Sequence, residues 1–355
     1  MIRRRDDLVA LEGYHSPQVE ASVRLNTNES PFGPPAGVLG ELAAELPAIL
    51  EQLNRYPDRE ALALRSAIGQ LHGRDLGEVY CANGSNEILQ LLMLAYGGPG
   101  RCILLFEPTY AMHRQIAMVT GTAVVSVLRE GDFTVDPSAA ALAVEEHQPS
   151  LTFICAPNNP TGTMDPAALI EAVCAAGDGL VVLDEAYVQF ADAALSEQLG
   201  EHRNRVAVVR TFSKTWGMAG LRLGYVLAAP GVIEDLEVVA LPYHLSALTQ
   251  ATGLAAVAHL AEAEASVALV RAERERVAER LAQLGAQVWP SQANFVLFRP
   301  GRQPASDLWA ELLEASVLVR DFSRVPGLEG CLRVTIGTVR ENDAFLAAYE
   351  ESNHG

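Results

Sequence analysis

The chain has 355 residues, of which 49% are hydrophobic and 20% are charged, which suits a main domain plus a smaller one and excludes a disordered chain. The formal net charge of -18 argues against a nucleic-acid partner, because phosphate-backbone binding needs clustered Lys and Arg. Five widely spaced cysteines include no C-x-x-C pair, so we expect neither a disulfide framework nor a metal site.

We expect a cytoplasmic protein without a membrane partner. The N-terminal segment MIRRRDDLVALEGY contains two aspartates and no apolar stretch of signal-peptide length. The most apolar region, residues 247–270, is interrupted by Gln, Thr, His and Glu at helical spacing. It therefore predicts an amphipathic helix packed inside the protein, not a membrane span.

Short apolar runs alternate with helical stretches through the middle of the chain. The first 45 residues, rich in Pro and Gly, predict no strand or helix set of their own, while residues 84–97 and 165–177 predict helices. Five nearly continuous apolar runs are typical of a parallel sheet buried on both faces. They lie at residues 101–108, 122–128, 151–157, 179–187 and 205–212.

The pattern changes after about residue 245 to long charged helices and then to further strand-like segments. These are the helical residues 270–285 and the strand-like residues 288–300 and 331–338. We predict an α/β protein whose large domain, residues 46–245, has a mostly parallel sheet flanked by helices. The smaller α+β domain comprises residues 246–355 and residues 1–45, which include an N-terminal arm.

Ligands of such sheets bind at the carboxyl ends of the strands, so the residues after each apolar run are site candidates. These are Pro108 to Tyr110, Pro157 to Gly162, Asp184 to Tyr187, and Thr211 to Lys214. A lone lysine is usually a solvated surface charge. Lys214 directly follows a predicted strand, and a lysine becomes a nucleophile when it is desolvated or held as a Schiff base.

The other strand ends supply groups that suit an aromatic cofactor. Asp184 closes an apolar strand, where a carboxylate either caps a helix or pairs with a protonated pyridine nitrogen. Tyr187 and Asn159 are placed to reach one phenolic oxygen, and Tyr110 is placed to cover the face of a ring.

A phosphate cradle is predicted at the start of the helix 84–97. Gly84, Ser85 and Asn86 would present backbone N–H groups at a helix N-terminus, where anions bind, although plain helix capping is the alternative. Ser213 and Arg222 would complete the cradle, since an arginine among apolar neighbours needs an anionic partner.

Taken together, these segments resemble the fold-type I pyridoxal phosphate aminotransferases, and most closely the histidinol-phosphate aminotransferase family. The resemblance runs from about Tyr14 to Thr338. It rests on the motifs NESPFGPP, NGSNE, EPTY, NNPTG, DEAY, SK with LRLGY, and LRVTIGT, in the family's order. The cofactor that it implies is pyridoxal 5'-phosphate.

The resemblance implies a role for each candidate around the cofactor. Lys214 carries the cofactor as a Schiff base, Asp184 holds the pyridine nitrogen, Asn159 and Tyr187 bind the phenolic oxygen, and Tyr110 stacks on the ring. Ser85, Asn86, Ser213 and Arg222 match the phosphate-binding positions, and Gly84 and Thr211 are further cofactor-binding candidates.

Other positions concern the substrate and a second subunit. Tyr56 matches a tyrosine that reaches the phosphate of the neighbouring subunit's cofactor, so a homodimer with composite sites is implied. Arg333 matches the residue that binds the carboxylate of amino-acid substrates, Arg320 and Tyr14 match residues that bind a substrate phosphate, and Asn159 also borders the substrate.

The implied reaction converts histidinol phosphate and 2-oxoglutarate to imidazole acetol phosphate and glutamate, in histidine biosynthesis. Two departures leave other donors open: the segment after Tyr14 lacks a frequent Gly-Lys, and His244 stands where several relatives have Asn. An aromatic amino acid aminotransferase and a threonine-phosphate decarboxylase are the alternatives. A silent ligand sensor or an NTP-binding domain is disfavoured, the latter because no G-x-x-x-x-G-K-[ST] loop is present.

Overall fold

Seven strands form a sheet that is parallel except where β8 is inserted. The computed structural model describes residues 2–9, 11, 13 and 19–352, and its large sheet has the order β2-β8-β7-β6-β5-β3-β4. Only the pairings of β8 with β2 and β7 are antiparallel. The strands are β2 (Val79–Ala82), β3 (Cys102–Glu107), β4 (Ala123–Leu128), β5 (Leu151–Cys155), β6 (Leu180–Asp184), β7 (Val206–Thr211) and β8 (Gly224–Leu227). The predicted mostly parallel sheet is confirmed.

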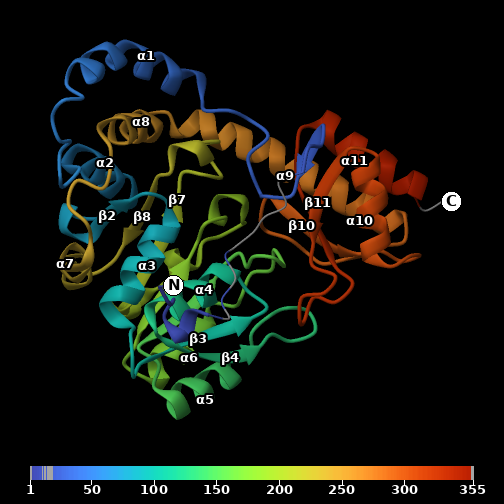
Figure 1. The fold of residues 1–355 in the computed structure, drawn as a ribbon, viewed down its shortest axis with the longest axis horizontal. Coiled ribbons are helices and arrows are strands. Elements are labelled where there is room, and N and C mark those ends of the chain that lie inside the picture. The colour runs from blue at the N-terminus through green and yellow to red at the C-terminus, as the bar shows by residue number, and fades with distance from the viewer. Residues whose placement is uncertain (1, 10, 12, 14–18, 353–355) are drawn as a thin grey trace.

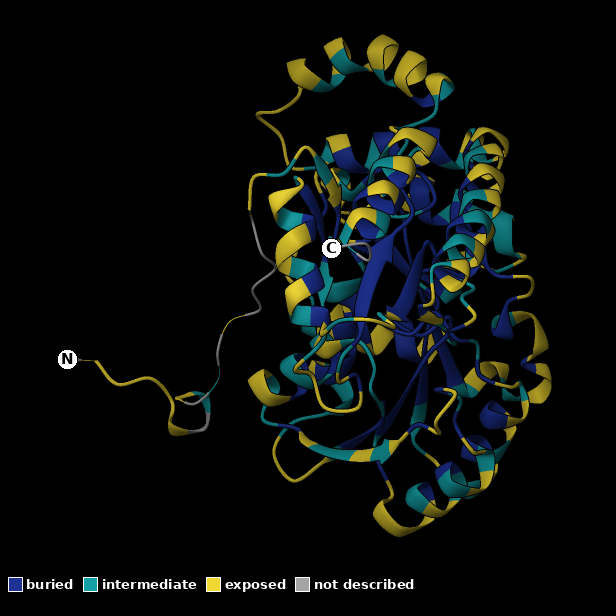
Figure 2. Ribbon diagram, turned by 90° about the vertical axis from the view of Figure 1, so that its right-hand side faces the viewer, coloured by how far each residue is buried: buried dark blue, intermediate teal, exposed yellow. Residues whose placement is uncertain are grey.

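The central strands are apolar along their whole length because their side chains alternate between two cores. Leu104 and Ile154 belong to one core, while Ile103 and Phe153 belong to the other. The helices that contribute to the first core include α2 (Leu62–His72), α5 (Pro137–His147), α6 (Ala168–Ala176) and α8 (Ala247–Ala258). Those of the second core are α3 (Ser85–Tyr96), α4 (Ala111–Thr120) and α7 (Pro230–Val239). Figure 2 shows the buried strands between helices whose outer faces are exposed.

A second sheet lies beside the first (Figure 1). Its order is β1-β11-β12-β10-β9, with β1 parallel to β11 and the other pairs antiparallel. Its strands are β1 (Val23–Leu25), β9 (Gln287–Val288), β10 (Phe295–Arg299), β11 (Val317–Asp321) and β12 (Leu332–Thr335). The helices α9 (Leu260–Gln283), α10 (Ala305–Glu314) and α11 (Val339–Ser352) add Val277, Leu308 and Phe345 to its core. The exact limits of the two predicted domains stay a prediction.

Two helical segments differ from the sequence-based expectation. The N-terminal region contains the helix α1 (Ala36–Glu51), which includes Pro47 and buries only Val38. This helix lies outermost, at the top of Figures 1 and 2, and packs on α8. The amphipathic helix expected at residues 247–270 is instead the pair α8 and α9, bent by 75°.

His259 occupies the break between α8 and α9. Its ring contacts Glu41 of α1 at 3.0 Å and Glu262 of α9 at 2.9 Å. The break between α8 and α9 thus lies where His259 contacts α1. Among the described helices, no single one has the length and hydropathy to cross a membrane, and the bent α8–α9 pair meets that test on length and composition only.

Gly253 gives a test of how tightly α8 is packed. A Cβ atom at this position would lie 2.4 Å from Cδ2 of Leu223 and 3.0 Å from Cδ1 of Leu64. Because both leucines are buried, we expect Gly253→Ala to lower the free energy of unfolding by about 1–3 kcal/mol and to lower the Tm.

The matched control is Gly40→Ala in α1, where an added Cβ meets nothing within 4 Å. This change should stabilise the helix by up to about 1 kcal/mol. Thermal unfolding of both variants checks the pair, and a Gly253→Ala protein with a Tm at or above that of the wild type would contradict the packing argument.

Candidate active site

A glycine turn and an arginine lie together at the N-terminus of α3. Gly84 is the residue before α3 and has φ 83°. A Cβ at Gly84 would lie 2.4 Å from Nη2 of Arg222, so only glycine lets the guanidinium approach. Among the described residues, no carboxylate forms an ion pair with Arg222. A helix N-terminus beside such a guanidinium favours a phosphate.

Hydroxyl groups from the end of β7 lie beside the same arginine. The Thr211 and Ser213 hydroxyls lie 3.0 Å apart, and Nη1 of Arg222 lies 3.4 Å from the Ser213 hydroxyl. Close approach of β8 fixes the loop, since a Cβ at Gly224 would lie 2.4 Å from the backbone nitrogen of Ser85. The structure therefore brings together the phosphate-binding positions that the sequence predicts.

Lys214 lies directly after these residues and points toward the N-terminal segment. Its Nζ donates to the Thr27 carbonyl at 3.2 Å and lies 5.9 Å from the ring centre of Tyr187. Burial, together with the positive charges of Arg333 and Arg222, lowers the pKa of the Lys214 amine to about 8. About a tenth of this amine is therefore uncharged and nucleophilic at pH 7.

Asp184 ends β6 as a buried carboxylate with a histidine partner. Its Oδ2 lies 3.0 Å from Nε2 of His113, and its Oδ1 accepts from the backbone N–H of Ala186 at 3.2 Å. His113 comes from α4, is fully buried, and makes an edge contact with Tyr110. Sequence reasoning missed His113. Its only signal was its position three residues after Tyr110, in a helix with an apolar face.

The Tyr187 hydroxyl is the meeting point of two asparagine side chains. It accepts from Nδ2 of Asn28 at 3.0 Å and from Nδ2 of Asn159 at 3.3 Å. Burial raises the pKa of Tyr187, so the hydroxyl keeps its proton and can donate it to a ligand. The predicted neighbours Asn159 and Tyr187 are thus in contact. Sequence reasoning did not assign Asn28, although it lies within the NESPFGPP motif.

Two arginines lie opposite each other in the second sheet. Arg333 on β12 pairs with Arg320 on β11 in the antiparallel register. The Arg333 guanidinium is buried, donates to Oδ1 of Asn159 and to the Asn26 carbonyl, and lies 4.9 Å from the ring centre of Phe295. Like charges on facing positions repel each other, so this pair favours an anionic ligand.

Tyr56 stands apart from this cluster. Tyr14 lies outside the described residues. Tyr56 is 81% exposed and stacks on Tyr243, with ring centres 4.6 Å apart. The next residue, His244, stacks on Tyr80 and contacts the Cys81 carbonyl at 3.0 Å. The segment that carries Tyr243 is therefore fixed to β2, the strand that leads into the phosphate cradle.

The chemistry of these residues fits pyridoxal 5'-phosphate. The cradle at Gly84 and Arg222 matches its phosphate, the buried carboxylate of Asp184 matches its ring nitrogen, and the contact of Tyr187 with Asn159 matches its phenolic oxygen. The amine of Lys214 matches its aldehyde, which condenses with amines. In the described ranges, no group of three or more His, Cys, Asp or Glu side chains is placed to hold a metal ion.

Comparison with known proteins agrees with this reading. Residues 20–348 match the family described as aminotransferase class I and II, and the fold and the site define a pyridoxal phosphate-dependent aminotransferase. Proteins named histidinol-phosphate aminotransferase are 46% identical in Frankia casuarinae, over 97% of this chain and 88% of the relative, and 46% identical in Thermobifida fusca, over 97% and 94%. The chain belongs to the histidinol-phosphate aminotransferase family.

Solved structures show the same fold. The crystal structure of histidinol-phosphate aminotransferase from Sinorhizobium meliloti, in complex with pyridoxal-5'-phosphate, has a TM-score of 0.89 at 24% identity and covers 100% of this chain and 98% of its own. The L-threonine-O-3-phosphate decarboxylase from Porphyromonas gingivalis has a TM-score of 0.79 at 23% identity, over 94% of this chain and 100% of its own. The fold is therefore shared by enzymes of different reaction types.

The lowered pKa of Lys214 predicts how cofactor attachment depends on pH. Only the neutral amine attacks an aldehyde, so the rate of covalent attachment should rise with pH and level off above about 8. The measurement mixes apoprotein with pyridoxal 5'-phosphate at a series of pH values, stops each sample with borohydride, and quantifies labelled Lys214 by mass spectrometry.

Arg333→Gln is the matched variant for this experiment, because loss of a nearby positive charge should move the midpoint to higher pH. A wild-type midpoint close to the ordinary lysine pKa of about 10.4 would contradict a desolvated Lys214.

Proposed function

We propose that the chain is a histidinol-phosphate aminotransferase, which converts histidinol phosphate and 2-oxoglutarate to imidazole acetol phosphate and glutamate in the cytoplasm. The observation that carries this substrate choice is the facing pair Arg320 and Arg333 beside Asn159. A phosphate monoester carries close to two negative charges at neutral pH. Two adjacent guanidiniums match it better than they match a single carboxylate.

Lys214 is the proposed catalytic base and acid. Pyridoxal 5'-phosphate supplies an electron sink that stabilises negative charge on the carbon bearing the substrate's amino group. Nζ of Lys214, once free, would take the proton from the substrate carbon that bears the amino group and would donate it to C4′ of the cofactor. A pKa of about 8 suits both directions of transfer, since general acid–base catalysis is most efficient near the working pH.

Asp184 and Tyr187 are proposed to set the electronic state of the ring. The Asp184 carboxylate, held by His113 at 3.0 Å, keeps a proton on the pyridine nitrogen. The Tyr187 hydroxyl and the Asn159 amide hold the phenolic oxygen, while Tyr110 covers the ring and Gly84, Ser85, Asn86, Thr211, Ser213 and Arg222 bind the phosphate.

The substrate experiment measures the first half-reaction. Purified holoenzyme is mixed with histidinol phosphate, phenylalanine or threonine phosphate, and conversion to the pyridoxamine form is followed by absorbance while products are identified by mass spectrometry. We expect fast conversion with histidinol phosphate. Failure with this donor alone would overturn the proposal in favour of the aromatic aminotransferase, and release of carbon dioxide from threonine phosphate would favour the decarboxylase.

Arg320→Gln tests the phosphate site directly. Charge-assisted hydrogen bonds contribute about 1.5–3 kcal/mol, so the KM for histidinol phosphate should rise roughly 10- to 100-fold, while conversion of phenylalanine should change little. The control is Arg299→Gln on β10, which is separated from β11 by β12; the Arg299 guanidinium lies over Trp289. Equal effects of Arg320→Gln on both donors would exclude a phosphate-specific role.

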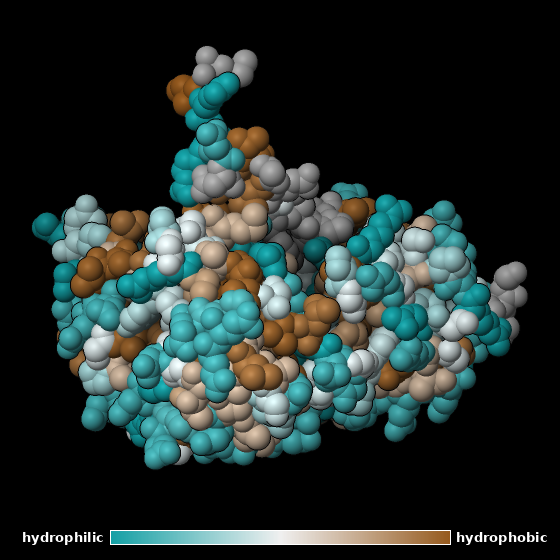
Figure 3. Space-filling view, turned by 90° about the horizontal axis from the view of Figure 1, so that it is seen from below, coloured by the Kyte–Doolittle hydropathy of each residue, from teal (hydrophilic) through white to brown (hydrophobic). Residues whose placement is uncertain are grey.

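We further propose a homodimer in which Tyr56 reaches the partner's cofactor phosphate. Large apolar side chains are exposed where α1 ends and where the segment before α8 passes beside it: Leu50, Leu53, Tyr56, Leu241 and Tyr243. Apolar surface gathered in this way marks an interface. Seen from below, opposite α1, the surface is mostly hydrophilic, with hydrophobic patches near its middle (Figure 3). A second copy of this chain would cover the apolar side and place Tyr56 at its site.

Leu241→Asp tests this interface, because it would bury an unpaired carboxylate between subunits. We expect a monomer in sedimentation experiments and weaker cofactor binding. Leu128→Asp is the control, since Leu128 is 75% exposed and Leu241 is 76% exposed, but Leu128 ends β4, away from α1. A Leu241→Asp protein that stays dimeric would contradict the proposed surface.

The composite site has its own test in mixed dimers. A Lys214→Ala subunit and a Tyr56→Ala subunit should together form one site with both residues intact. Activity of the refolded mixture above the mean of the two parents is the expected result, and no gain would contradict a shared site.

A further inference from the structure

Asn158 is a fully buried asparagine at the point where β5 leads into the loop that contains Asn159. Its Nδ2 donates to the Pro108 carbonyl at 3.0 Å and to the Thr161 hydroxyl at 2.8 Å, and its Oδ1 accepts from the Thr109 hydroxyl at 2.9 Å. Both N–H groups of the amide are thus used, in contacts with two different strand-end loops. Because its donors and its acceptor all have hydrogen-bond partners, the Asn158 side chain is held in one orientation.

The main chain of Asn158 closes the loop on itself. Its N–H donates to the Thr163 carbonyl at 2.8 Å, and its carbonyl accepts from the Gly162 N–H at 2.8 Å. The Gly162 carbonyl in turn accepts from the N–H of Gln292, on the second sheet's side, at 2.7 Å. The loop 158–163 is therefore a closed turn held from both sides.

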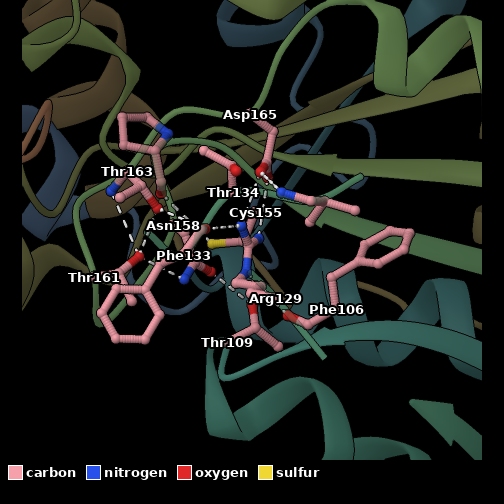
Figure 4. Close-up of polar contacts among 12 residues, drawn as sticks. Phe106, Thr109, Arg129, Phe133, Thr134, Cys155, Asn158, Thr161, Thr163 and Asp165 are labelled. Atoms are coloured by element: carbon pink, nitrogen blue, oxygen red, sulfur yellow. Dashed lines mark hydrogen bonds and ion pairs between the residues drawn. The ribbon is translucent and has the colours of Figure 1, made fainter. Parts of the chain in front are cut away.

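A buried ion pair between Arg129 and Asp165 lies next to this turn (Figure 4). Arg129 and Asp165 have side chains with 0% exposure, and they form two hydrogen bonds of 2.8 and 3.0 Å. Arg129 also donates to the carbonyls of Phe106 and Phe133. The Thr163 hydroxyl shares the Phe133 carbonyl at 3.2 Å, so the pair is connected to the turn through one backbone oxygen.

A contribution to the free energy of folding does not by itself explain why this ion pair is buried. Replacing a buried ion pair with apolar residues is often neutral or stabilising, because desolvation offsets the attraction between the charges. The pair does hold the chain segments that it joins in a fixed position relative to each other. It joins the end of β3, through the Phe106 carbonyl, to the segment that ends at Asp165.

The two residues next to this network are those assigned to the cofactor ring. Asn159 follows Asn158 and contacts Tyr187 and Arg333, and Tyr110 follows Thr109 and contacts Asn86 at 3.3 Å. We propose that Asn158 is a positioning residue that joins the Thr109–Tyr110 loop to the Asn158–Thr163 loop, with the Arg129–Asp165 pair as its fixed base. It thereby sets the placement of Tyr110 and Asn159 on the bound cofactor. This inference rests on the proposed roles of those two residues.

The experiment compares cofactor binding with protein stability. Asn158→Ala removes all three side-chain hydrogen bonds, so the Kd of apoprotein for pyridoxal 5'-phosphate should rise about tenfold, equal to 1.4 kcal/mol. The pH midpoint of the visible absorption band of the bound cofactor should also shift, because Asn159 no longer holds the phenolic oxygen in place. Thr109→Val should produce a smaller change in both, whereas Thr109→Ser, which keeps the hydroxyl, should match the wild type.

Leu308→Ala is the control for lost stability, since Leu308 is fully buried in the core of the second sheet. It should lower the Tm without moving the Kd or the pH midpoint. Wild-type values of Kd and pH midpoint in Asn158→Ala, or in Thr109→Val if Asn158→Ala does not fold, would overturn the inference. So would a rise in Kd for Leu308→Ala that matches its loss of Tm. Unchanged values in Asn159→Ala would instead contradict the proposed role of Asn159.

Discussion

The parallel arrangement of the large sheet is the constraint on which the rest of the site depends. Because β3, β5, β6 and β7 are parallel neighbours, the segments after them meet at one edge. Asp184, Asn159 and Lys214 are far apart in sequence, and they share this edge because each lies at or just after the end of one of these strands. Their strands are buried on both faces, so the backbone that carries them has little freedom to shift.

Features that depend on local sequence could be predicted. The five predicted strands match β3, β4, β5, β6 and β7, because an apolar run of that length between Gly, Pro and Asn has few alternatives in a doubly covered sheet. The order of short motifs then identified the family, and with it Lys214 and the cradle at Gly84. Their chemical roles are proposals that the experiments above test.

Features that depend on tertiary contacts could not be predicted. In the sequence, nothing distinguishes His113 from other residues of a buried helix face. Only the fold places it 3.0 Å from Asp184. Asn28 reaches Tyr187 across 159 positions of the chain, and no periodicity encodes that contact. The helix α1 contains Pro47, buries one residue and lies against α8, so its sequence shows little amphipathic signal. The break at His259 likewise involves Glu41, which is distant in sequence.

The facing arginines have a consequence for the kinetics of encounter. The protein carries a net charge of -18, so a doubly charged anion diffusing toward it is repelled by the overall field. Mobile ions screen that repulsion beyond about 8 Å at physiological ionic strength. Arg320 and Arg333 therefore attract the anion only over the last few ångströms. Association should consequently become faster, not slower, when moderate salt is added, the reverse of what is usual for an enzyme that captures an anion with arginines.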